Sequence, residues 1–256
     1  MELLERTFTA RALVLAFTVT VLSVPAQAGR IVVNNDEWAT SNVGYNSAGA
    51  ANSNNFAFNL ATFLAGSGGN ILVYSDLFPL NQSSFRASLS AGGFTVTYGK
   101  ASANLSGYNA VFLAESMLGS VSQLTDFVNG GGGVYIAAGT AFPDPVVEAA
   151  RWNTFLAGFG LQLDTAYNNC CGNKTIDNSG HALFNGVAQL YFRDGNTVST
   201  TGGSPNASII ESSSGGLGLI GVYNSAVTAI PEPSTYVLVG AGLVAAYLKR
   251  RSASRV

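Results

Sequence analysis

The stretch of sequence that decides the fold runs from Asn109 to Gly139 and reads NAVFLAESMLGSVSQLTDFVNGGGGVYIAAG. It opens and closes with a short apolar run, as buried parallel strands do. Between these runs, the apolar residues of 121–128 recur at helical spacing. The four glycines at 130–133 precede a strand rather than a helix, so they predict a tight turn and not a phosphate cradle. The stretch therefore predicts a β-α-β unit.

The same alternation continues toward the N-terminus and just beyond the quoted stretch. Short apolar runs predict strands at 30–34, 70–74 and 94–98, in addition to those at 109–114 and 134–138. Helices are expected at 56–64, 85–89 and 145–156, and a Ser/Asn/Gly-rich loop at 39–54. Asp144 is the expected N-cap of the last helix, because Pro145 suits the first helical position. Strands separated by helices predict an α/β fold with a doubly wound, mainly parallel sheet.

Beyond Leu163 the sequence becomes rich in turn residues. Apolar runs at 188–192, 208–211 and 217–223 predict further strands. These strands follow one another without long helical segments, which favours antiparallel pairing. The sequence therefore predicts a β-rich C-terminal extension of the sheet.

Composition and charge limit the classes of partner. The chain has 256 residues, 47% of them hydrophobic and 10% charged, which suits a globular domain with a real core. Half of the basic residues lie near the two ends, so region 29–229 keeps six basic and eleven acidic residues, a net charge of −5. Such an acidic surface disfavours nucleic acid as a partner and suits hydrogen bonding to polar polymers.

Residues 1–28 have the three zones of a secretory signal peptide. Arg6 and Arg11 give a basic start, and an apolar stretch follows over 12–24. Ala26 and Ala28 then occupy the small-residue positions that a signal peptidase reads. We therefore expect an exported protein whose mature chain begins at Gly29.

The C-terminal residues 230–256 have three parts in a fixed order. Pro231, Glu232 and Pro233 come first, an uncharged apolar run that predicts a transmembrane helix covers 236–248, and a basic cluster follows. The basic cluster should stay cytoplasmic and hold the preceding chain outside. It consists of Lys249, Arg250 and Arg251.

This arrangement resembles the PEP-CTERM sorting signal of Gram-negative bacteria. The resemblance implies an exosortase as partner, a transient inner-membrane anchor, and delivery to the cell surface or the exopolysaccharide matrix. An ordinary C-terminal anchor is the alternative, and it predicts the same topology without processing. The chain then divides into a signal peptide at 1–28, an ectodomain at 29–229 and a sorting signal at 230–256.

The ectodomain resembles a second family. The segments 108–113, 124–133 and 134–140 are similar to the class I glutamine-amidotransferase-like superfold. His181-Ala-Leu-Phe-Asn-Gly-Val187 is similar to a segment that follows the sheet in trehalose-utilisation-like relatives. The resemblance covers roughly residues 30–190 and implies a flavodoxin-like sheet.

The resemblance does not carry over a catalytic nucleophile. Catalytic members have a Cys on a sharp turn after a central strand, with a His to activate it. Here the strand at 134–138 is followed by Gly139 and Thr140 instead. Cys170 and Cys171 come thirty residues later in a polar stretch, where an oxidising compartment favours a disulfide between them. His181 is expected to start a helix or lie in a loop rather than act as a base.

Polar residues follow the predicted strands and are expected to gather at one rim of the sheet, where open α/β sheets bind ligands. Carboxylates beside a Trp suit a sugar, and Asp, Glu and Asn oxygens suit Ca²⁺, although no metal or other cofactor is required. The alternative is that these residues cap helices and solvate loops. The candidate rim residues are Asp36, Glu37, Trp38, Asp76, Glu115 and Thr140.

The sequence leaves two functions open. The first is a non-catalytic binding or structural component of the cell surface or matrix, with extracellular polysaccharide as a partner. The second is a secreted hydrolase of glycans or esters that uses carboxylates around Glu37 and Glu115.

Overall fold

A computed structural model of the chain describes residues 28–100, 104–140 and 143–225. They belong to a compact unit that spans 26–226. The predicted signal peptide, the Pro231–Pro233 segment, the C-terminal transmembrane helix and the basic cluster lie outside the described residues. Within the described ranges, no helix is both long and apolar enough to cross a membrane.

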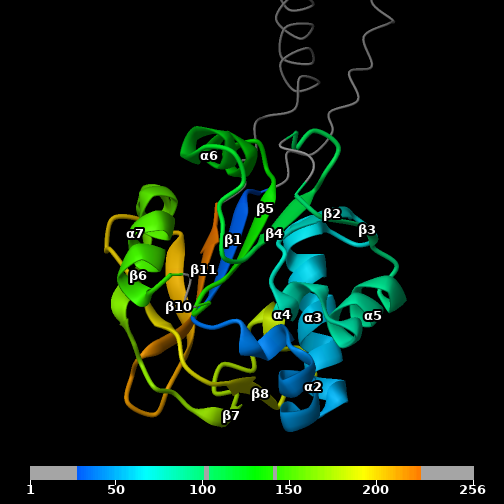
Figure 1. The fold of residues 1–256 in the computed structure, drawn as a ribbon, viewed down its shortest axis with the longest axis vertical. Coiled ribbons are helices and arrows are strands. Elements are labelled where there is room, and N and C mark those ends of the chain that lie inside the picture. Colours follow the sequence, from blue (N-terminus) through cyan, green and yellow to red (C-terminus); the bar gives the residue numbers. More distant parts are fainter. Residues whose placement is uncertain (1–27, 101–103, 141–142, 226–256) are drawn as a thin grey trace, which may run out of the picture. The chain divides into compact units, whose positions relative to one another are not determined.

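The centre of the fold is a seven-stranded sheet in the order β10-β11-β1-β5-β4-β2-β3 (Figure 1). The first five strands of the chain pair in parallel, while β10 and β11 extend the sheet in antiparallel fashion. The predicted mainly parallel sheet and its β-rich C-terminal extension are therefore confirmed. The strands are β1 (Arg30–Asn34), β2 (Asn70–Tyr74), β3 (Thr95–Tyr98), β4 (Ala110–Leu113), β5 (Gly133–Ala137), β10 (Ala207–Ser212) and β11 (Gly218–Asn224).

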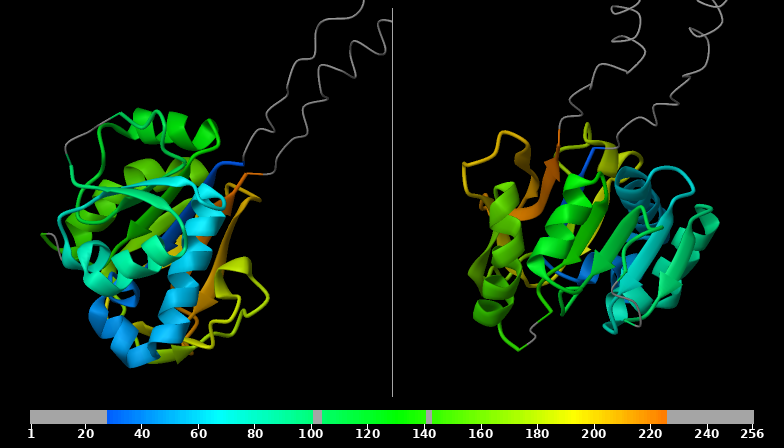
Figure 2. Two further views of the ribbon diagram at one scale, coloured as in Figure 1. Left: turned by 90° about the vertical axis from the view of Figure 1, so that its right-hand side faces the viewer. Right: turned by 90° about the horizontal axis from the view of Figure 1, so that it is seen from above.

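Helices cover both faces of this sheet (Figure 2). Apolar residues of α3 and α5 join one buried cluster, and those of α6 and α7 join the other. Asp144 caps α7 as predicted, because its side chain accepts a hydrogen bond from the Val147 N–H. The α-helices of the described residues are α2 (Asn42–Ala48), α3 (Ala50–Ala65), α4 (Phe78–Asn81), α5 (Ser83–Ala91), α6 (Val121–Asn129) and α7 (Pro145–Leu156).

The strand order corrects the expectation of a flavodoxin-like sheet. In that order the first strand lies between the second and the third, whereas here β1 lies between β5 and β11. The connection explains the difference. Helix α3 has 16 residues, about 24 Å, and contacts β1, β5, β4 and β2. It therefore carries the chain across two strand positions before β2 begins.

The prediction of a loop at 39–54 is also wrong, because the chain there forms a short 3-10 helix η1 (Trp38–Thr40), α2 and the start of α3. Ser41 caps α2 by accepting a bond from the Gly44 N–H at 3.0 Å. The asparagines, which usually favour turns, instead find distant backbone partners. Asn52 accepts from the Ala188 N–H at 2.8 Å, and Asn59 donates to the Asn185 carbonyl at 2.8 Å. Tertiary contacts thus stabilise a helix that local sequence disfavours.

Two small antiparallel sheets complete the C-terminal half. Strand β6 (Leu161–Tyr167) pairs with β9 (Asn196–Thr200), and β7 (Gly172–Thr175) pairs with β8 (Gln189–Phe192). The sequence predicted only β8 among these four, because the others are polar and partly exposed. Two more 3-10 helices occur, η2 (Ala157–Phe159) and η3 (Ala182–Phe184).

The two ends of the described domain meet at the end of the sheet where the parallel strands begin. The Ser225 N–H donates to the Gly29 carbonyl at 2.9 Å, next to the N-terminal end of β1. The carboxyl ends of the parallel strands lie at the opposite end of the sheet.

Candidate ligand-binding rim at the strand ends

Polar residues gather at the carboxyl ends of the parallel strands, as parallel pairing of β1, β5, β4 and β2 requires. We call this group the rim. It contains the six predicted residues and three that the sequence analysis did not single out as candidates, and it consists of Asp36, Glu37, Trp38, Ser75, Asp76, Lys100, Glu115, Thr140 and Glu148.

Glu115 lies where the strand order changes direction, between the ends of β2 and β4. Its carboxylate accepts hydrogen bonds from the Ser75 hydroxyl at 2.7 Å and the Asp76 N–H at 3.0 Å. It also forms an ion pair with Lys100, which pairs with Asp76 at 3.1 Å. Glu115 has a positive φ of 34°, a conformation that non-glycine residues rarely adopt. The local fold therefore holds this carboxylate in one position against three donors.

Asp36 links two loops beneath the rim. Its side chain accepts from the Trp38 N–H at 2.9 Å and from the Arg193 N–H at 2.5 Å. Burial raises the pKa of Asp36 to about 7, although the backbone donors favour its charged form. A Cβ on Gly195 would lie 1.9 Å from the Asn35 carbonyl oxygen, so only glycine permits this close approach. Asp36 is thus a structural connection.

Trp38 is half-buried and its ring already has two neighbours. The Phe78 ring lies 5.2 Å away, and the Arg193 guanidinium lies 4.8 Å from the centre of the indole. This is a cation–π contact. A sugar could stack on that face of Trp38 only by displacing Arg193.

Glu148 is fully buried and comes from the first turn of α7. It accepts from the Thr140 hydroxyl at 2.8 Å and from the Thr140 N–H at 3.1 Å, and the Tyr167 hydroxyl lies 3.5 Å away. Burial raises the pKa of Glu148, and these donors act against that shift. Its carboxylate therefore fixes the loop that follows β5.

Glu37 differs from the buried rim carboxyls Asp36, Glu115 and Glu148. It is 6% exposed, and its Oε2 atom is buried without a hydrogen-bond partner among the described residues. Burial raises its pKa to about 8, and the negative charges of Asp36, Glu148 and Glu115 act in the same direction. At neutral pH Glu37 is consequently mostly protonated, so it can both donate and accept a hydrogen bond.

The two cysteines and the histidine lie outside the rim residues. Cys170 and Cys171 occupy the short segment between β6 and β7, and their sulfur atoms are in contact. The oxidised pair stays a prediction. His181 caps η3 by accepting from the Leu183 N–H at 3.2 Å, and its ring packs against Phe63 and Phe184. The prediction that His181 starts a helix is confirmed.

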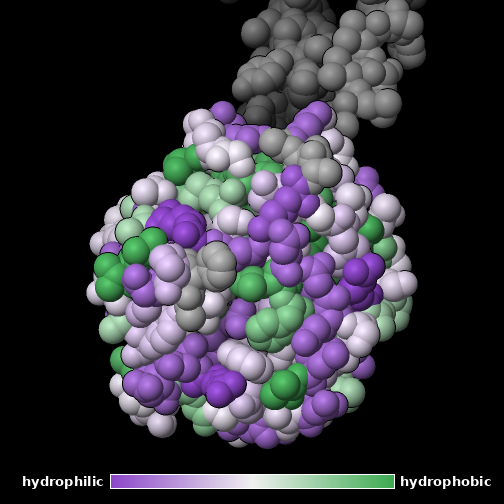
Figure 3. Space-filling view, viewed as in Figure 1, coloured by the Kyte–Doolittle hydropathy of each residue, from purple (hydrophilic) through white to green (hydrophobic). Residues whose placement is uncertain are grey.

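Within the described residues, no group of three or more His, Cys, Asp or Glu side chains is arranged to hold a metal ion. Figure 3 shows that apolar residues form small separate patches among hydrophilic ones on the face it displays. Two surface hollows of the described residues, of about 420 and 440 Å³, lie beside α5 and are not lined by rim residues.

The comparisons with known proteins concern the C-terminal end of the chain. Residues 229–251 match the PEP-CTERM protein-sorting motif. The chain carries an exosortase sorting signal. The motif implies that the protein is exported, anchored transiently in the membrane and processed by an exosortase. No curated protein and no solved structure matches the chain.

Two further rim residues lie at strand ends and follow the same rule as the predicted candidates. Ser75 follows β2 and Lys100 comes two residues after β3, where the rule used for Asp76 and Glu115 also applies. Glu148 could not be found in this way, because it comes from the first turn of a helix and not from a strand end.

Proposed function

We propose that this exported, exosortase-sorted protein is a non-catalytic binding component of the cell surface or extracellular matrix, and that the rim holds a neutral polar ligand. The acidic, polar ectodomain suits such a ligand and repels anionic ones. A hydroxyl-bearing saccharide fits this chemistry, since each hydroxyl both donates and accepts.

The observation that carries the proposal is the state of the rim carboxyls. Asp36, Glu115 and Glu148 each accept hydrogen bonds from several protein donors, as described above. Glu37 has a buried oxygen with no partner among the described residues, and such atoms call for a ligand, a water or an ion. A two-carboxylate hydrolysis needs two groups that reach the substrate. The rim carboxyls other than Glu37 are held by protein donors or, for Asp76, by the Lys100 ammonium group, which favours binding over catalysis.

The position of the chain ends supports this role. Gly29 and Ser225 lie at the end of the sheet opposite to the rim. The rim therefore lies at the end of the domain away from Ser225, where the chain continues. This suits a protein that displays a binding site outward from the surface that holds it.

A hydrolase is the second candidate, and the raised pKa of Glu37 favours it. A carboxyl that is protonated near neutral pH, close to the Lys100-paired Glu115, resembles the division of roles in acid-base catalysis by two carboxyl groups. In that case Glu37 would act as the general acid and Glu115 as the ionised partner.

A glycan-array and hydrolase-substrate screen on the exported protein distinguishes the two functions. We expect retention of a neutral glycan without turnover, at least tenfold weaker retention by Glu37→Leu, and near-wild-type retention by Glu37→Gln, whose amide also donates and accepts. Turnover that both Glu37→Gln and Glu115→Gln abolish would establish the hydrolase instead. Retention that is unchanged in Glu37→Leu would remove the rim from the binding site.

The sorting part of the proposal predicts two cleavages. In a host with an exosortase, intact-mass analysis of the surface protein should find a chain that begins at Gly29 and ends close to residue 233. The physical reason is that Pro231 and Pro233 keep the segment extended and accessible, while the apolar run after it is short and contains Gly240 and Gly242. A surface protein that still ends at Val256 would contradict processing.

The likeness of the ectodomain to amidotransferase-like proteins is also a proposal. Its support is local: the resembling segments contribute β4, α6 and β5, and His181 to Val187 pack along α3 through Asn55 and Asn59. The different strand order limits this likeness to those segments.

A further inference from the structure

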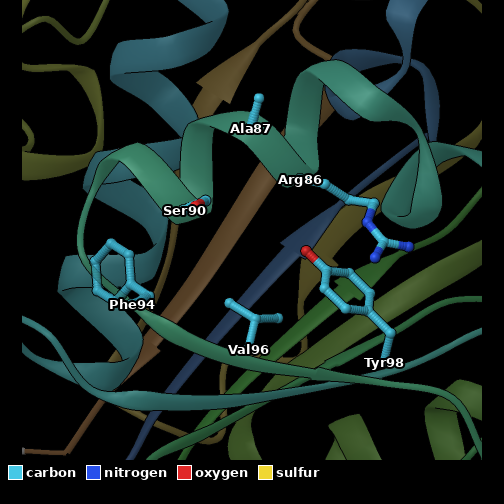
Figure 4. Close-up of a pocket in the computed structure, with 6 residues that line it drawn as sticks. All are labelled: Arg86, Ala87, Ser90, Phe94, Val96 and Tyr98. Atoms are coloured by element: carbon cyan, nitrogen blue, oxygen red, sulfur yellow. The ribbon is translucent and has the colours of Figure 1, made fainter.

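A second polar surface lies across α5, away from the rim. One hollow of about 440 Å³ lies between α3 and α5. Another of about 420 Å³ lies between α5 and the edge strand β3 (Figure 4). Ala87, an exposed residue of α5, lines both. The two hollows therefore meet on one continuous surface, and both volumes are in the range of small-ligand sites.

The first hollow has an uncovered aromatic ring. Phe58 is 44% exposed, although an aromatic ring of this size is usually buried. Phe94 holds the ring from one side, with centroids 6.0 Å apart and planes tilted by 56°. Gly92 permits this arrangement, since a Cβ there would lie 2.9 Å from the Phe58 ring. Small residues of α5 face the ring and leave it open, namely Ala87, Ser88 and Ala91.

Two asparagines beside Phe58 present opposite hydrogen-bonding groups. The Asn54 carbonyl oxygen accepts from the Ser88 hydroxyl at 2.7 Å, so its amide nitrogen is left for an external acceptor. The Asn55 amide nitrogen donates to the Gly186 carbonyl at 2.8 Å, so its oxygen is left for an external donor. These bonds fix both side chains before a ligand arrives, which lowers the entropic cost of binding.

The charge of this hollow restricts the ligand. The residues that line it are asparagine, serine, alanine, glycine and phenylalanine, with no charged side chain among those described. A donor and an acceptor beside an aromatic face match neighbouring hydroxyls on a sugar ring, whose C–H groups can pack on the negative face of the aromatic ring. Charged ligands would lose their hydration without gaining a partner.

The second hollow extends the surface rather than repeating it. The Arg86 guanidinium lies 3.9 Å from the centre of the Tyr98 ring, and Figure 4 shows both side chains at one end of the hollow. Ser90 and Val96 line it as well. The Arg86 guanidinium covers one face of the Tyr98 ring, so this end of the hollow offers the guanidinium N–H groups and the Tyr98 hydroxyl as hydrogen-bonding groups next to the Phe58 hollow. Such a continuation favours a chain of sugar units over a single one.

We propose that the surface of α3, α5 and β3 binds a neutral polysaccharide, with one sugar unit stacked on Phe58 between Asn54 and Asn55 and the chain continuing across Ala87 toward Tyr98. This site is independent of the rim, because the two share no residue. It adds a polymer-binding surface to the ligand-binding rim proposed above.

Native affinity electrophoresis of the full exported protein tests the site with dextran, pullulan, galactomannan and xyloglucan in the gel. We expect at least one of these neutral polymers to retard the protein, and Phe58→Ala to weaken this retardation at least tenfold. Asn54→Asp should do the same, since it keeps the acceptor for Ser88 but loses the external donor. Leu217→Ala is the matched control, because Leu217 is also an exposed apolar residue, at 40% exposure.

Each possible result of this electrophoresis experiment either supports or overturns the proposed site. Absence of retardation by all four polymers, or equal retardation of Phe58→Ala and the wild type, would overturn it. Monosaccharides that compete as strongly as the polymer would overturn the claim of a polymer site. Loss of retardation in Glu37→Leu but not in Phe58→Ala would assign the polymer to the rim. Near-identical circular dichroism melting curves for the variants would exclude unfolding as the cause.

Discussion

The variant Val111→Asp should fail to fold at 25 °C or melt far below the wild type. Val111 is fully buried in β4, paired with Leu72 of β2 on one side and Val134 of β5 on the other. The substitution places a carboxylate without a partner inside the sheet, which costs roughly 3–5 kcal/mol or more. That is a large part of the typical stability of a domain, about 5–15 kcal/mol. Thermal melting followed by circular dichroism measures the loss.

Val43→Asp is the matched control for this variant. Val43 lies on α2 and is 44% exposed, so the same substitution there should leave the melting temperature nearly unchanged. Cooperative melting of Val111→Asp at the wild-type temperature would show that Val111 is not buried within the sheet. The comparison therefore tests the element around which the sequence first suggested the fold.

The strands of the parallel sheet could be predicted because burial on both faces leaves a direct mark in the sequence. Each of β1, β4 and β5 is a run of apolar residues bounded by polar or glycine residues. Helix α7 could be predicted to the residue, since Asp144 and Pro145 mark its start.

The strand order could not be predicted in the same way. It depends on how far the connection between β1 and β2 reaches, and most of that connection looked like a loop. Its asparagines are held by backbone groups near residues 185–188, more than 120 residues later in the chain. A local pattern contains no information about such partners. Strand β9 was not predicted for a related reason. Its polar residues are held in a strand by pairing with β6, and they show no alternation of polar and apolar residues that would indicate a strand.

The residues of the candidate site could be predicted from the sequence, but their protonation and hydrogen-bond partners could not. The position after a strand placed Glu37, Asp76 and Glu115 at the rim. Their protonation and partners depend on burial and on residues from elsewhere in the fold, such as Lys100 and Glu148. The difference between a saturated Glu115 and an unpartnered Glu37 appears only in three dimensions.

Glu37→Gln should stabilise the protein at pH 8 and change its stability little at pH 5. The pKa of Glu37 is about 8 in the folded protein and near 4.5 in the unfolded chain. Between these values the folded state holds a proton that the unfolded chain releases, so the free energy of unfolding falls as pH rises through this window. Glutamine does not ionise. The gain at pH 8 should be roughly 3–5 kcal/mol, or about 6–20 °C in melting temperature for a domain of this size.

Melting curves at pH 5 and pH 8 measure this difference, with Asp126→Asn as the control for loss of one exposed negative charge. Asp36, Glu148 and Glu115 act on Glu37 and are unchanged in the variant, so they contribute to both proteins. Burial lowers the pKa of His181, which costs stability as pH falls below 6.5, again equally in both. The stabilisation should therefore appear at pH 8 alone. An equal effect at both pH values would mean that Glu37 is ionised in the fold, and the rim would then present a charged group rather than a neutral donor to its ligand.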